Sequence, residues 1–405
     1  MSSPGCWPGT GLTGWNVAEH FDVVIIGGGI HGVGVAQAAA CDGYSVLLIE
    51  KSALANGSSS RSSKLIHGGL RYLEGFDFAL VWESLYERTL LLKLAPELVR
   101  LQPFHIPVYP DTSRRPLTIR AGLSLYALLG GLQQANRFRK LQRSEWDGLD
   151  GLETRGLQAV YRYFDAQTND AGLTRAVMQS AIELGAELAC PAEFVTAEVD
   201  GSGCHIQYRH NGSVRECHAH TLVNAAGPWA NTLAGHIKPT PERIDIDLVQ
   251  GAHLVMEGGL KQGCYYMEVP TDGRAVFLLP WGEYALLGTT ETAFTGSPDE
   301  VRPLASEETY LLKVMQHYFP QRSLRVIDRF AGLRVLPASK HDAFRRSREI
   351  QLPVDNPQAP RVVTIYGGKL TGYRATARKV MRLLHRTLPA SKRVARTSRL
   401  RLKPV

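Results

Sequence analysis

The chain has 405 residues, of which 44% are hydrophobic and 21% charged, and a formal net charge of +8. This composition is typical of a globular protein with one large or two fused domains, and it excludes disordered and collagen-like chains. No apolar stretch reaches the about 20 residues that span a bilayer. The N-terminus lacks the basic and apolar regions of a secretory signal. We therefore expect neither a membrane-spanning nor a secreted protein.

None of the six cysteines belongs to a CxxC pair, and no group of His and Cys residues has the spacing of metal ligands. Six cysteines in a chain of this length are also too few for a disulfide framework. We expect reduced thiols in a cytoplasmic protein and no metal site.

The basic residues are concentrated at the C-terminal end. Residues 366–405 hold 12 Lys and Arg and no acid, so the remaining 34 basic and 38 acidic residues leave the rest of the chain slightly acidic. The last stretch, 389–405, is interpreted as a solvated basic tail, or as an arm that contacts a membrane or a nucleic acid. A short basic tail specifies no partner by itself, and we expect no nucleic-acid binding.

Residues 1–19 are expected to be disordered, and the ordered chain begins with an apolar run, FDVVII, that ends at glycines as a buried parallel strand does. An Ala-rich helix and a second apolar run, YSVLLIE, follow. The turn GGGIHG satisfies G-x-G-x-x-G: Gly27 permits the tight turn, Gly29 lets a pyrophosphate approach the backbone, and Gly32 allows close helix packing. This pattern predicts a dinucleotide-binding strand–helix–strand unit.

An acidic residue, Glu50, ends the second strand, where a ribose-binding carboxylate belongs. A carboxylate accepts hydrogen bonds from ribose hydroxyls and disfavours a 2′-phosphate, so FAD or NAD is preferred over NADP. The chain has a single complete fingerprint, near its N-terminus, which favours FAD.

Residues 52–70 are rich in Ser and Gly but contain KLIHGGLRYL, which is too particular for a linker. Residues 78–98 are expected to form a helix. The apolar segment 118–132 is flanked by basic residues, which predicts either a contact with an anionic bilayer or a buried helix with solvated ends.

The second half continues with a helix from about residue 174, strands up to NAAGPWA, and a hairpin over VFLLP-WGEY-ALLGTTE. A helix is expected over 307–318. RVVTIYGGKLTGYRATARKVMRLLH then repeats the order of strand, glycine turn and helix.

Several of these segments carry a resemblance to a known family. SSSRSSKLIHGGLRYLE at residues 58–74 resembles the flavin-contacting segment of FAD-dependent glycerol-3-phosphate dehydrogenases, which are D-amino-acid-oxidase-like flavoproteins. NAAGPWA, GAHLV, LLGTTE, GLRVLP and GGKLTGYR match further family motifs in order. The chain departs from the family at His31, where Asn is common, at Gly372, where Thr is usual, and around GLRVLP, where GVRPL is usual. The family also usually continues after GGKLT as a helical C-terminal domain.

The resemblance implies an α/β fold, in which an FAD-binding Rossmann-like domain carries an inserted α+β substrate domain built on an antiparallel sheet. The FAD-binding domain would comprise residues 20–75, 152–228 and 328–388, and the substrate domain residues 76–151 and 229–327. The basic tail would follow at 389–405.

The implied activity is oxidation of sn-glycerol 3-phosphate to dihydroxyacetone phosphate by hydride transfer to flavin N5, with electrons passed to quinone. Two alternatives stay open: a related enzyme that oxidises a 2-hydroxyacid or an amine with oxygen or another acceptor, and a non-catalytic flavin-binding paralogue. The expected partners are a phosphorylated polyol, a quinone or other electron acceptor, and an anionic membrane. The protein is expected to be cytoplasmic and to lie on the inner face of that membrane. A homodimer is left open.

The candidate substrate residues are cations and histidines. Lys369, in a glycine turn that opens a helix, is suited to stabilise negative charge near the flavin or the substrate. Arginine binds phosphate bidentately, and the resemblance points to Arg71, Arg334 and Arg348, with Tyr72 adding a hydroxyl. His67 and His253 are alternative bases.

The resemblance also implies a set of cofactor-binding residues. Trp229, in NAAGPWA, is expected to be a core residue instead. The predicted cofactor set is Gly27, Gly28, Gly29, Ile30, His31, Gly32, Glu50, Lys51, Ser59, Ser62, Ser63, Lys64, Leu65, His67, Gly69, Phe194, Ala226, Gly227, Gly332, Gly368, Lys369, Leu370 and Thr371.

Overall fold

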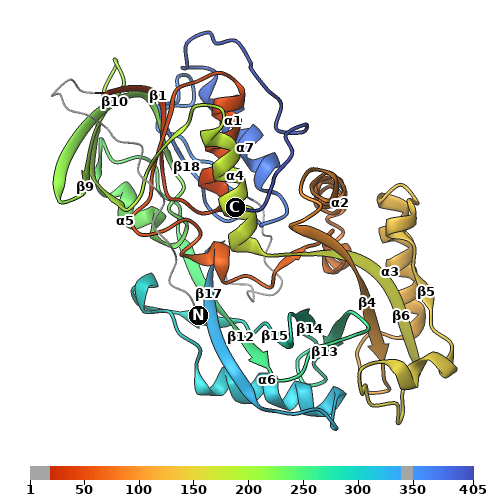
Figure 1. The fold of residues 1–405 in the computed structure, drawn as a ribbon. Helices are drawn as coiled ribbons and strands as arrows, with labels where there is room; N and C mark the ends of the chain where they lie inside the picture. Colours follow the sequence, from red (N-terminus) through yellow and green to blue (C-terminus); the bar gives the residue numbers. More distant parts are fainter. Residues whose placement is uncertain (1–18, 339–349) are drawn as a thin grey trace.

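A computed structural model describes residues 19–338 and 350–405. Two sheets organise this part of the chain, and each forms the centre of one lobe (Figure 1). The chain passes between the lobes several times, so that neither lobe is one continuous segment. The α/β architecture expected from the sequence is confirmed.

The first sheet contains the predicted strand–helix–strand unit: β1 (Glu19–Ile26), α1 (Ile30–Cys41) and β2 (Val46–Ile49). β1 lies between β2 and β10 (Ser213–Asn224) and pairs parallel with both. All four residues of β2 are buried, as expected for a parallel strand covered on both faces. The sheet order is β11-β8-β9-β10-β1-β2-β7, and β18 pairs with β10.

Helices cover one face of this sheet and an antiparallel meander covers part of the other. α1 packs against α4 (Asp170–Ile182) and α7 (Tyr373–Leu384), and their apolar side chains form one core with those of β1 and β2. On the opposite face, apolar residues of β1 and β2 pack against those of β8, β9 and β10, the antiparallel strands of the same sheet. The other elements of this lobe are β7 (Glu187–Ala189), β8 (Ala192–Val199), β9 (Cys204–His210), α5 (Ala230–Ala234), β11 (Ile237–Lys238) and β18 (Val362–Thr364).

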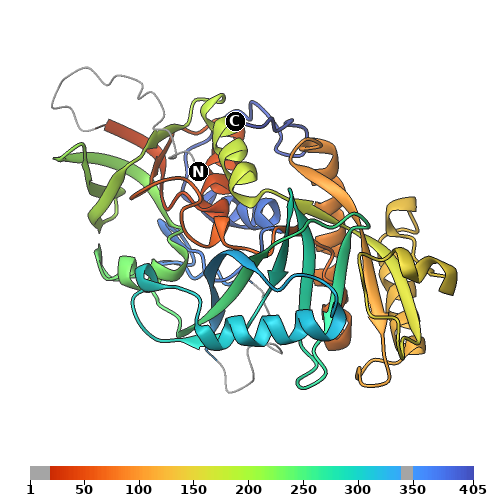
Figure 2. The same ribbon diagram turned by 60° about the horizontal axis from the view of Figure 1, so that its bottom comes forward.

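The second sheet is mostly antiparallel and has the order β16-β12-β15-β14-β13-β4-β6-β3, with β17 on β12 and β5 on β6. α6 (Ala305–Tyr318) lies along its outer face (Figure 2), and the helix packs its apolar residues against that face. The strands are β3 (Leu65–Ile66), β4 (Val99–Val108), β5 (Arg139–Lys140), β6 (Ala159–Thr168), β12 (Ile246–Met256), β13 (Cys264–Glu268), β14 (Ala275–Trp281), β15 (Tyr284–Gly288), β16 (Thr292–Phe294) and β17 (Val326–Pro337). The predicted hairpin is confirmed as the antiparallel pair of β14 and β15.

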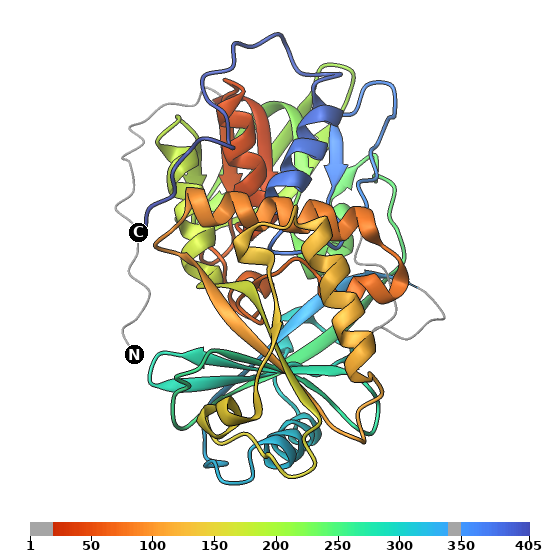
Figure 3. The ribbon, with the colours of Figure 1, turned by 90° about the vertical axis from the view of Figure 1, so that its right-hand side faces the viewer.

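Two helices flank the lobes and face the viewer in Figure 3: α2 (Phe78–Leu94) and α3 (Pro116–Leu129). Glu87 on α2 is fully buried and accepts a hydrogen bond from Arg374 Nη1 of α7 at 2.8 Å. This ion pair joins α2 to the helix that follows the GGKLTGYR motif. Short 3₁₀ turns lie at η1 (Ser58–Ser60), η2 (Leu70–Gly75), η3 (Gln134–Asn136), η4 (Arg143–Gly148), η5 (Gly227–Trp229) and η6 (Pro298–Glu300).

The sheets divide the chain differently from the predicted domain boundaries. β6 lies within 152–228 and most of β17 within 328–388, both assigned to the FAD-binding domain, yet both strands belong to the second sheet. β6 pairs with β4 along its whole length, and β17 pairs with β12. β3, within 20–75, also pairs with β6. Segments assigned to the FAD-binding domain therefore contribute β3, β6 and β17 to the second sheet.

The C-terminal residues are docked rather than free. The amide of Val394 donates to Cys41 O at 2.9 Å, and the amide of Leu402, only 3% exposed, donates to Leu94 O at 2.8 Å. Arg393 Nε donates to Asp42 Oδ1 at 2.6 Å. The expectation of a wholly solvated tail is wrong for the backbone, although most basic side chains there are exposed. The predicted N-terminal disorder concerns residues outside the described ones, apart from Glu19, which begins β1.

No helix in the described part of the chain is long and apolar enough to cross a membrane. The five cysteines in that part, Cys41, Cys190, Cys204, Cys217 and Cys264, are not in disulfides, and all but Cys190 are buried.

Candidate active site

A cavity of about 600 Å³ opens where β1, β2 and β10 end, and its wall is completed by residues of the second sheet. Cofactors of open α/β sheets bind beyond the carboxyl ends of the parallel strands. The volume lies within the range of small-molecule sites. The two lobes therefore meet around one site at the expected edge of the first sheet.

The glycine turn has the tight geometry that the fingerprint predicts. Gly27 has φ +110°, a conformation that side chains rarely adopt. A Cβ on Gly32 would clash with Gly27 O. α1 starts with no acid in its first turn and no capping side chain of its N-cap residue. The amide of Ile30 donates to Ser59 Oγ at 2.9 Å, and the partial positive charge of this helix end fits a pyrophosphate.

Glu50 lies in the cavity wall where a ribose is expected. Its Oε2 accepts a hydrogen bond from Gly28 N at 2.7 Å, and its Oε1 accepts one from Ser52 N at 2.9 Å. The carboxylate is thus fixed to the glycine turn, with acceptor capacity left for ribose hydroxyls. Together with the turn, it fits the dinucleotide part of FAD.

Replacing Glu50 with alanine is expected to weaken FAD retention. A hydrogen bond to a charged group contributes about 1.5–3 kcal/mol, so the dissociation constant should rise about tenfold or more. FAD content after dialysis measures this. Glu216→Ala, an exposed glutamate on β10, is the control. Unchanged FAD content in Glu50→Ala would refute the ribose assignment.

The motif around Lys369 meets the one around His67 at the other end of the cavity. Gly367 and Gly368 have φ of +77° and +93° and turn the chain ahead of Lys369. Lys369 Nζ lies 3.7 Å from the centre of the Tyr72 ring. The amide of His67 donates to Thr371 Oγ1 at 3.1 Å. The structure therefore brings together two motifs that lie about 300 residues apart in the chain.

Four arginines lie in the cavity wall: the predicted Arg71 and Arg334, and Arg61 and Arg274, which were not predicted from the sequence. Arg334 Nη1 forms an ion pair with Glu291 Oε1 at 2.8 Å. Arg274 is held by Asp272, with an Nη2–Oδ2 distance of 2.6 Å. The predicted Arg348 lies outside the described residues.

The two candidate bases differ in their surroundings. His67 is half-buried in the cavity wall. His253 is 2% exposed, and its Nε2 is 2.9 Å from Ser63 Oγ. Burial, and then the charges of Arg334 and Lys64, lower the pKa of His253 to about 3. Burial also lowers the pKa of His31 to about 4. Both rings are neutral at pH 7. Because the pKa of His253 is so low, its imidazole is a weak base.

Most predicted cofactor residues line the cavity, but four do not. Gly28 bonds Glu50 through its amide, and Gly32 packs against the turn. Gly69 lies against the Tyr72 ring and outside the wall. Tyr72, predicted as a substrate residue, does not line the cavity either. The Lys64 side chain turns away to Asp170, with Nζ–Oδ1 at 2.8 Å. Those in the wall are Gly27, Gly29, Ile30, His31, Glu50, Lys51, Ser59, Ser62, Ser63, Leu65, His67, Phe194, Ala226, Gly227, Gly332, Gly368, Lys369, Leu370 and Thr371.

Several further wall residues were not predicted from the sequence. Trp229, expected in the core, is half-buried in the wall, and its Nε1 donates to Asp299 Oδ2 at 3.0 Å. Lys51 Nζ pairs with Asp299 Oδ1 at 2.8 Å, across the rim. Glu291 ends the LLGTTE motif, which marked the segment but not the residue. Asp165, an acid in the otherwise apolar centre of β6, is a further wall residue.

Comparison with known proteins places this site in a family. The family model described as FAD dependent oxidoreductase (DAO) matches residues 22–377. A glycerol-3-phosphate dehydrogenase of Pseudomonas tolaasii is 36% identical, and the match covers 90% of this chain and 71% of that protein. A D-erythritol 1-phosphate dehydrogenase of Brucella abortus is 33% identical, with 92% of this chain and 75% of that protein covered.

A solved structure agrees. The glycerol-3-phosphate dehydrogenase from Bacillus halodurans complexed with FAD matches with a TM-score of 0.74 and 25% identity, covering 95% of this chain and 68% of that chain. The glycine turn, the carboxylate that follows it and the cavity between the lobes have the arrangement that FAD requires. The chain belongs to the DAO family of FAD-dependent oxidoreductases.

Proposed function

We propose that the protein oxidises the secondary hydroxyl of a phosphorylated polyol to a ketone, with sn-glycerol 3-phosphate, giving dihydroxyacetone phosphate, as the first candidate. The observation that carries this is the gathering of Lys369, Arg71 and Arg334 in the wall of an FAD-family cavity. Fixed cations suit a phosphate dianion. The names of the relatives, a glycerol-3-phosphate and an erythritol 1-phosphate dehydrogenase, support a phosphorylated polyol.

When bound, FAD supplies the hydride acceptor. Arg71 and Arg334 hold the phosphate and so fix the position of the secondary carbinol in the cavity. Lys369, at the glycine turn, stabilises the negative charge that gathers during oxidation. His67 takes the hydroxyl proton: both histidines line the cavity, but His253 is a weak base. His253 supports the wall through Ser63.

The test is an anaerobic titration of the yellow holoprotein with glycerol 3-phosphate, followed at the flavin absorption band. Bleaching by glycerol 3-phosphate and not by glycerol would support the proposal. The rate with erythritol 1-phosphate, measured alongside, would show whether the protein prefers the shorter or the longer polyol. A holoprotein that no phosphorylated polyol bleaches would refute it. Bleaching by 2-hydroxyacids or amines, with peroxide released in air, would favour an oxidase of the same family.

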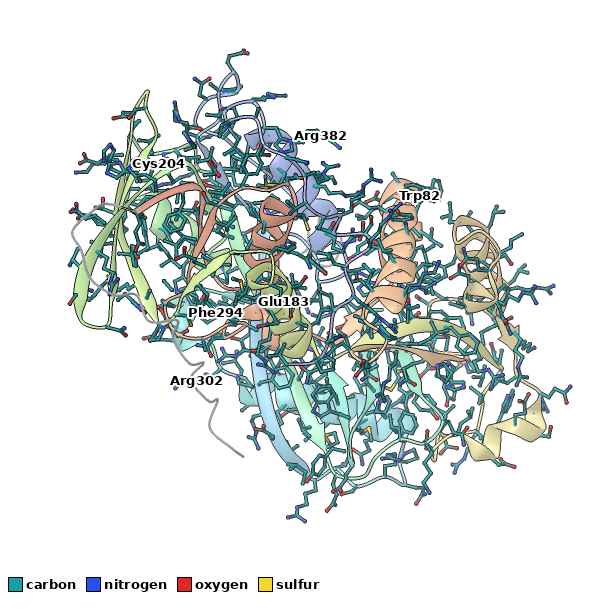
Figure 4. The ribbon with its side chains drawn as sticks, turned by 45° about the horizontal axis from the view of Figure 1, so that its top comes forward. Trp82, Glu183, Cys204, Phe294, Arg302 and Arg382 are labelled. Carbon is teal, nitrogen blue, oxygen red and sulfur yellow. The ribbon has the colours of Figure 1, made fainter. Side chains whose placement is uncertain are left out.

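Quinone is the electron acceptor that we propose, at the surface of an anionic membrane on its cytoplasmic face. α3 supports this, because Leu117 and Leu128 are 76% and 61% exposed and basic residues flank the helix. Trp82, labelled on the neighbouring α2 in Figure 4, is 59% exposed. Apolar side chains within a basic surface are typical of an interfacial helix.

Replacing both Leu117 and Leu128 with serine is therefore expected to reduce binding to vesicles that contain anionic lipid. Burying one leucine side chain contributes about 1.5–3 kcal/mol, and each substitution removes this contribution, so the vesicle-binding constant should fall about tenfold or more. Co-sedimentation with vesicles measures this. Val214→Ser, at an apolar residue of β10 that is 57% exposed, is the control. Equal sedimentation of the double variant and the wild type would exclude α3 as the contact.

A further inference from the structure

The carboxylate of Asp165 is a buried charge in the middle of β6. The residue is 2% exposed, and three donors from three different segments reach its two oxygens. Oδ1 accepts from Arg88 Nη1 at 2.7 Å and from Gly68 N at 3.1 Å, and Oδ2 accepts from Tyr126 Oη at 2.9 Å. A buried carboxylate is stable only with such partners. Arg88 and Tyr126 are themselves fully buried.

One of these donors belongs to a segment that lines the site on both sides of it, through His67 and Arg71. Gly68 lies between β3 and the 3₁₀ turn η2, which carries Arg71 and Tyr72. A Cβ on Gly68 would clash with the Tyr126 hydroxyl, so the backbone is pressed against α3 at this point. The next amide toward the N-terminus, that of His67, donates to Thr371 Oγ1 at 3.1 Å.

Two successive amides are therefore fixed from opposite directions. Thr371, two residues after Lys369, holds His67, and Asp165 holds Gly68. The chain that follows Gly68 delivers Arg71 to the cavity wall and the Tyr72 ring to Lys369. A displacement of this turn would move the proton acceptor and the phosphate ligand together, relative to Lys369.

We propose that Asp165, held by Arg88 and Tyr126, is a positioning residue for the reaction: it fixes the His67–Tyr72 segment against the segment that carries Lys369. The inference rests on the proposed function for its catalytic consequence, but not for its geometric one. Asp165 borders the cavity but is only 2% exposed, and donors already occupy both of its oxygens, so it acts through Gly68 N.

The test compares the Asp165→Asn holoprotein with Glu87→Gln. Glu87 is the matched control, since it is a fully buried carboxylate with an arginine partner, and its bonds go to α7 and not to the cavity wall. We expect Asp165→Asn to keep its FAD. The phosphorylated polyol should reduce that FAD at a rate about tenfold or more below the wild-type rate, because small misplacements of reacting groups slow a reaction strongly. Glu87→Gln should lose thermal stability while its flavin is reduced at the wild-type rate.

Hydrogen exchange supplies a readout that needs no substrate. In Asp165→Asn, exchange should quicken in peptides covering residues 65–75 more than elsewhere, whereas a purely structural loss would quicken it throughout. Tyr126→Phe removes one bond to Asp165 and keeps the charge pair; it should show both effects in weaker form, and it carries the test if Asp165→Asn does not fold.

Wild-type rates of flavin reduction in the Asp165 and Tyr126 variants, or slow reduction without a local change in exchange, would overturn the proposal. A wild-type holoprotein that no phosphorylated polyol reduces would refute the proposed function instead, and the exchange of residues 65–75 would still decide whether Asp165 holds the turn.

Discussion

Replacing Lys369 with alanine is expected to slow reduction of the bound flavin by about a hundredfold or more, while FAD remains bound. Removing one preorganised donor from a site where charge develops typically costs this much. Lys369 lies in the cavity wall at a turn made by two glycines with positive φ, and its ammonium lies over the Tyr72 ring. We expect the glycine turn and Glu50, which are bonded to each other elsewhere in the cavity, to hold the dinucleotide part of FAD, so FAD binding should survive the substitution.

The measurement is the rate of anaerobic bleaching at saturating substrate, with FAD content determined on the same sample. Lys369→Met, which keeps an unbranched stem, should be slowed similarly, because the charge and not the bulk is responsible. Lys379→Met is the control: Lys379 lies on α7 with its side chain 45% exposed and 3.5 Å from Glu83. Equal rates in wild type and the Lys369 variants would remove Lys369 from the mechanism.

What the sequence predicted well was local. Gly27, Gly32 and Glu50 belong to one continuous strand–helix–strand unit, and each residue has the place that the spacing indicates. The hairpin of β14 and β15 was likewise predictable from two apolar runs and a short turn. In such units the geometry is determined by neighbours in the chain, which a pattern can represent.

What the sequence did not predict depends on distant partners. β6 and β17 are apolar strands like any other, and only pairing with β4 and β12 places them in the second sheet. Lys64 lies in a motif assigned to flavin contact, yet its φ of +58° and Asp170 turn its side chain away from the cavity. Arg334 lies in the cavity wall, but no pattern in the sequence indicates its ion pair with Glu291, which joins residues 43 positions apart. Non-local charge pairs of this kind have no periodic signature in the sequence.

The protein is expected to lose stability as the pH falls from 6.5 toward 4, because buried histidines stay neutral in the folded chain. His105, on β4, is 2% exposed and lies against Tyr265, with ring centres 5.3 Å apart. Burial, and then the charge of Arg162, lower its pKa from 6.5 to about 4. Between these values the unfolded chain binds a proton that the folded chain does not, so the free energy of unfolding rises with pH there. For this one group the loss is about 2 kcal/mol at pH 5 relative to pH 8, and about 3 kcal/mol once the pH is below 4.

Replacing His105 with phenylalanine, which keeps an aromatic ring beside Tyr265, should remove this contribution. Urea unfolding at intervals from pH 8 to 4.5 measures it. The variant should lose about 2 kcal/mol less than the wild type between pH 8 and 5, and between pH 8 and 7.5 the two should change alike. Carboxylates with lowered pKa values, such as Asp272 beside Arg274, lose their contribution only at more acidic pH, below the unfolded value of 3.8, so this window reports mainly on histidine. A variant as sensitive to acid as the wild type would show that His105 is protonated in the folded protein at pH 5, and that burial in the second sheet does not keep it neutral.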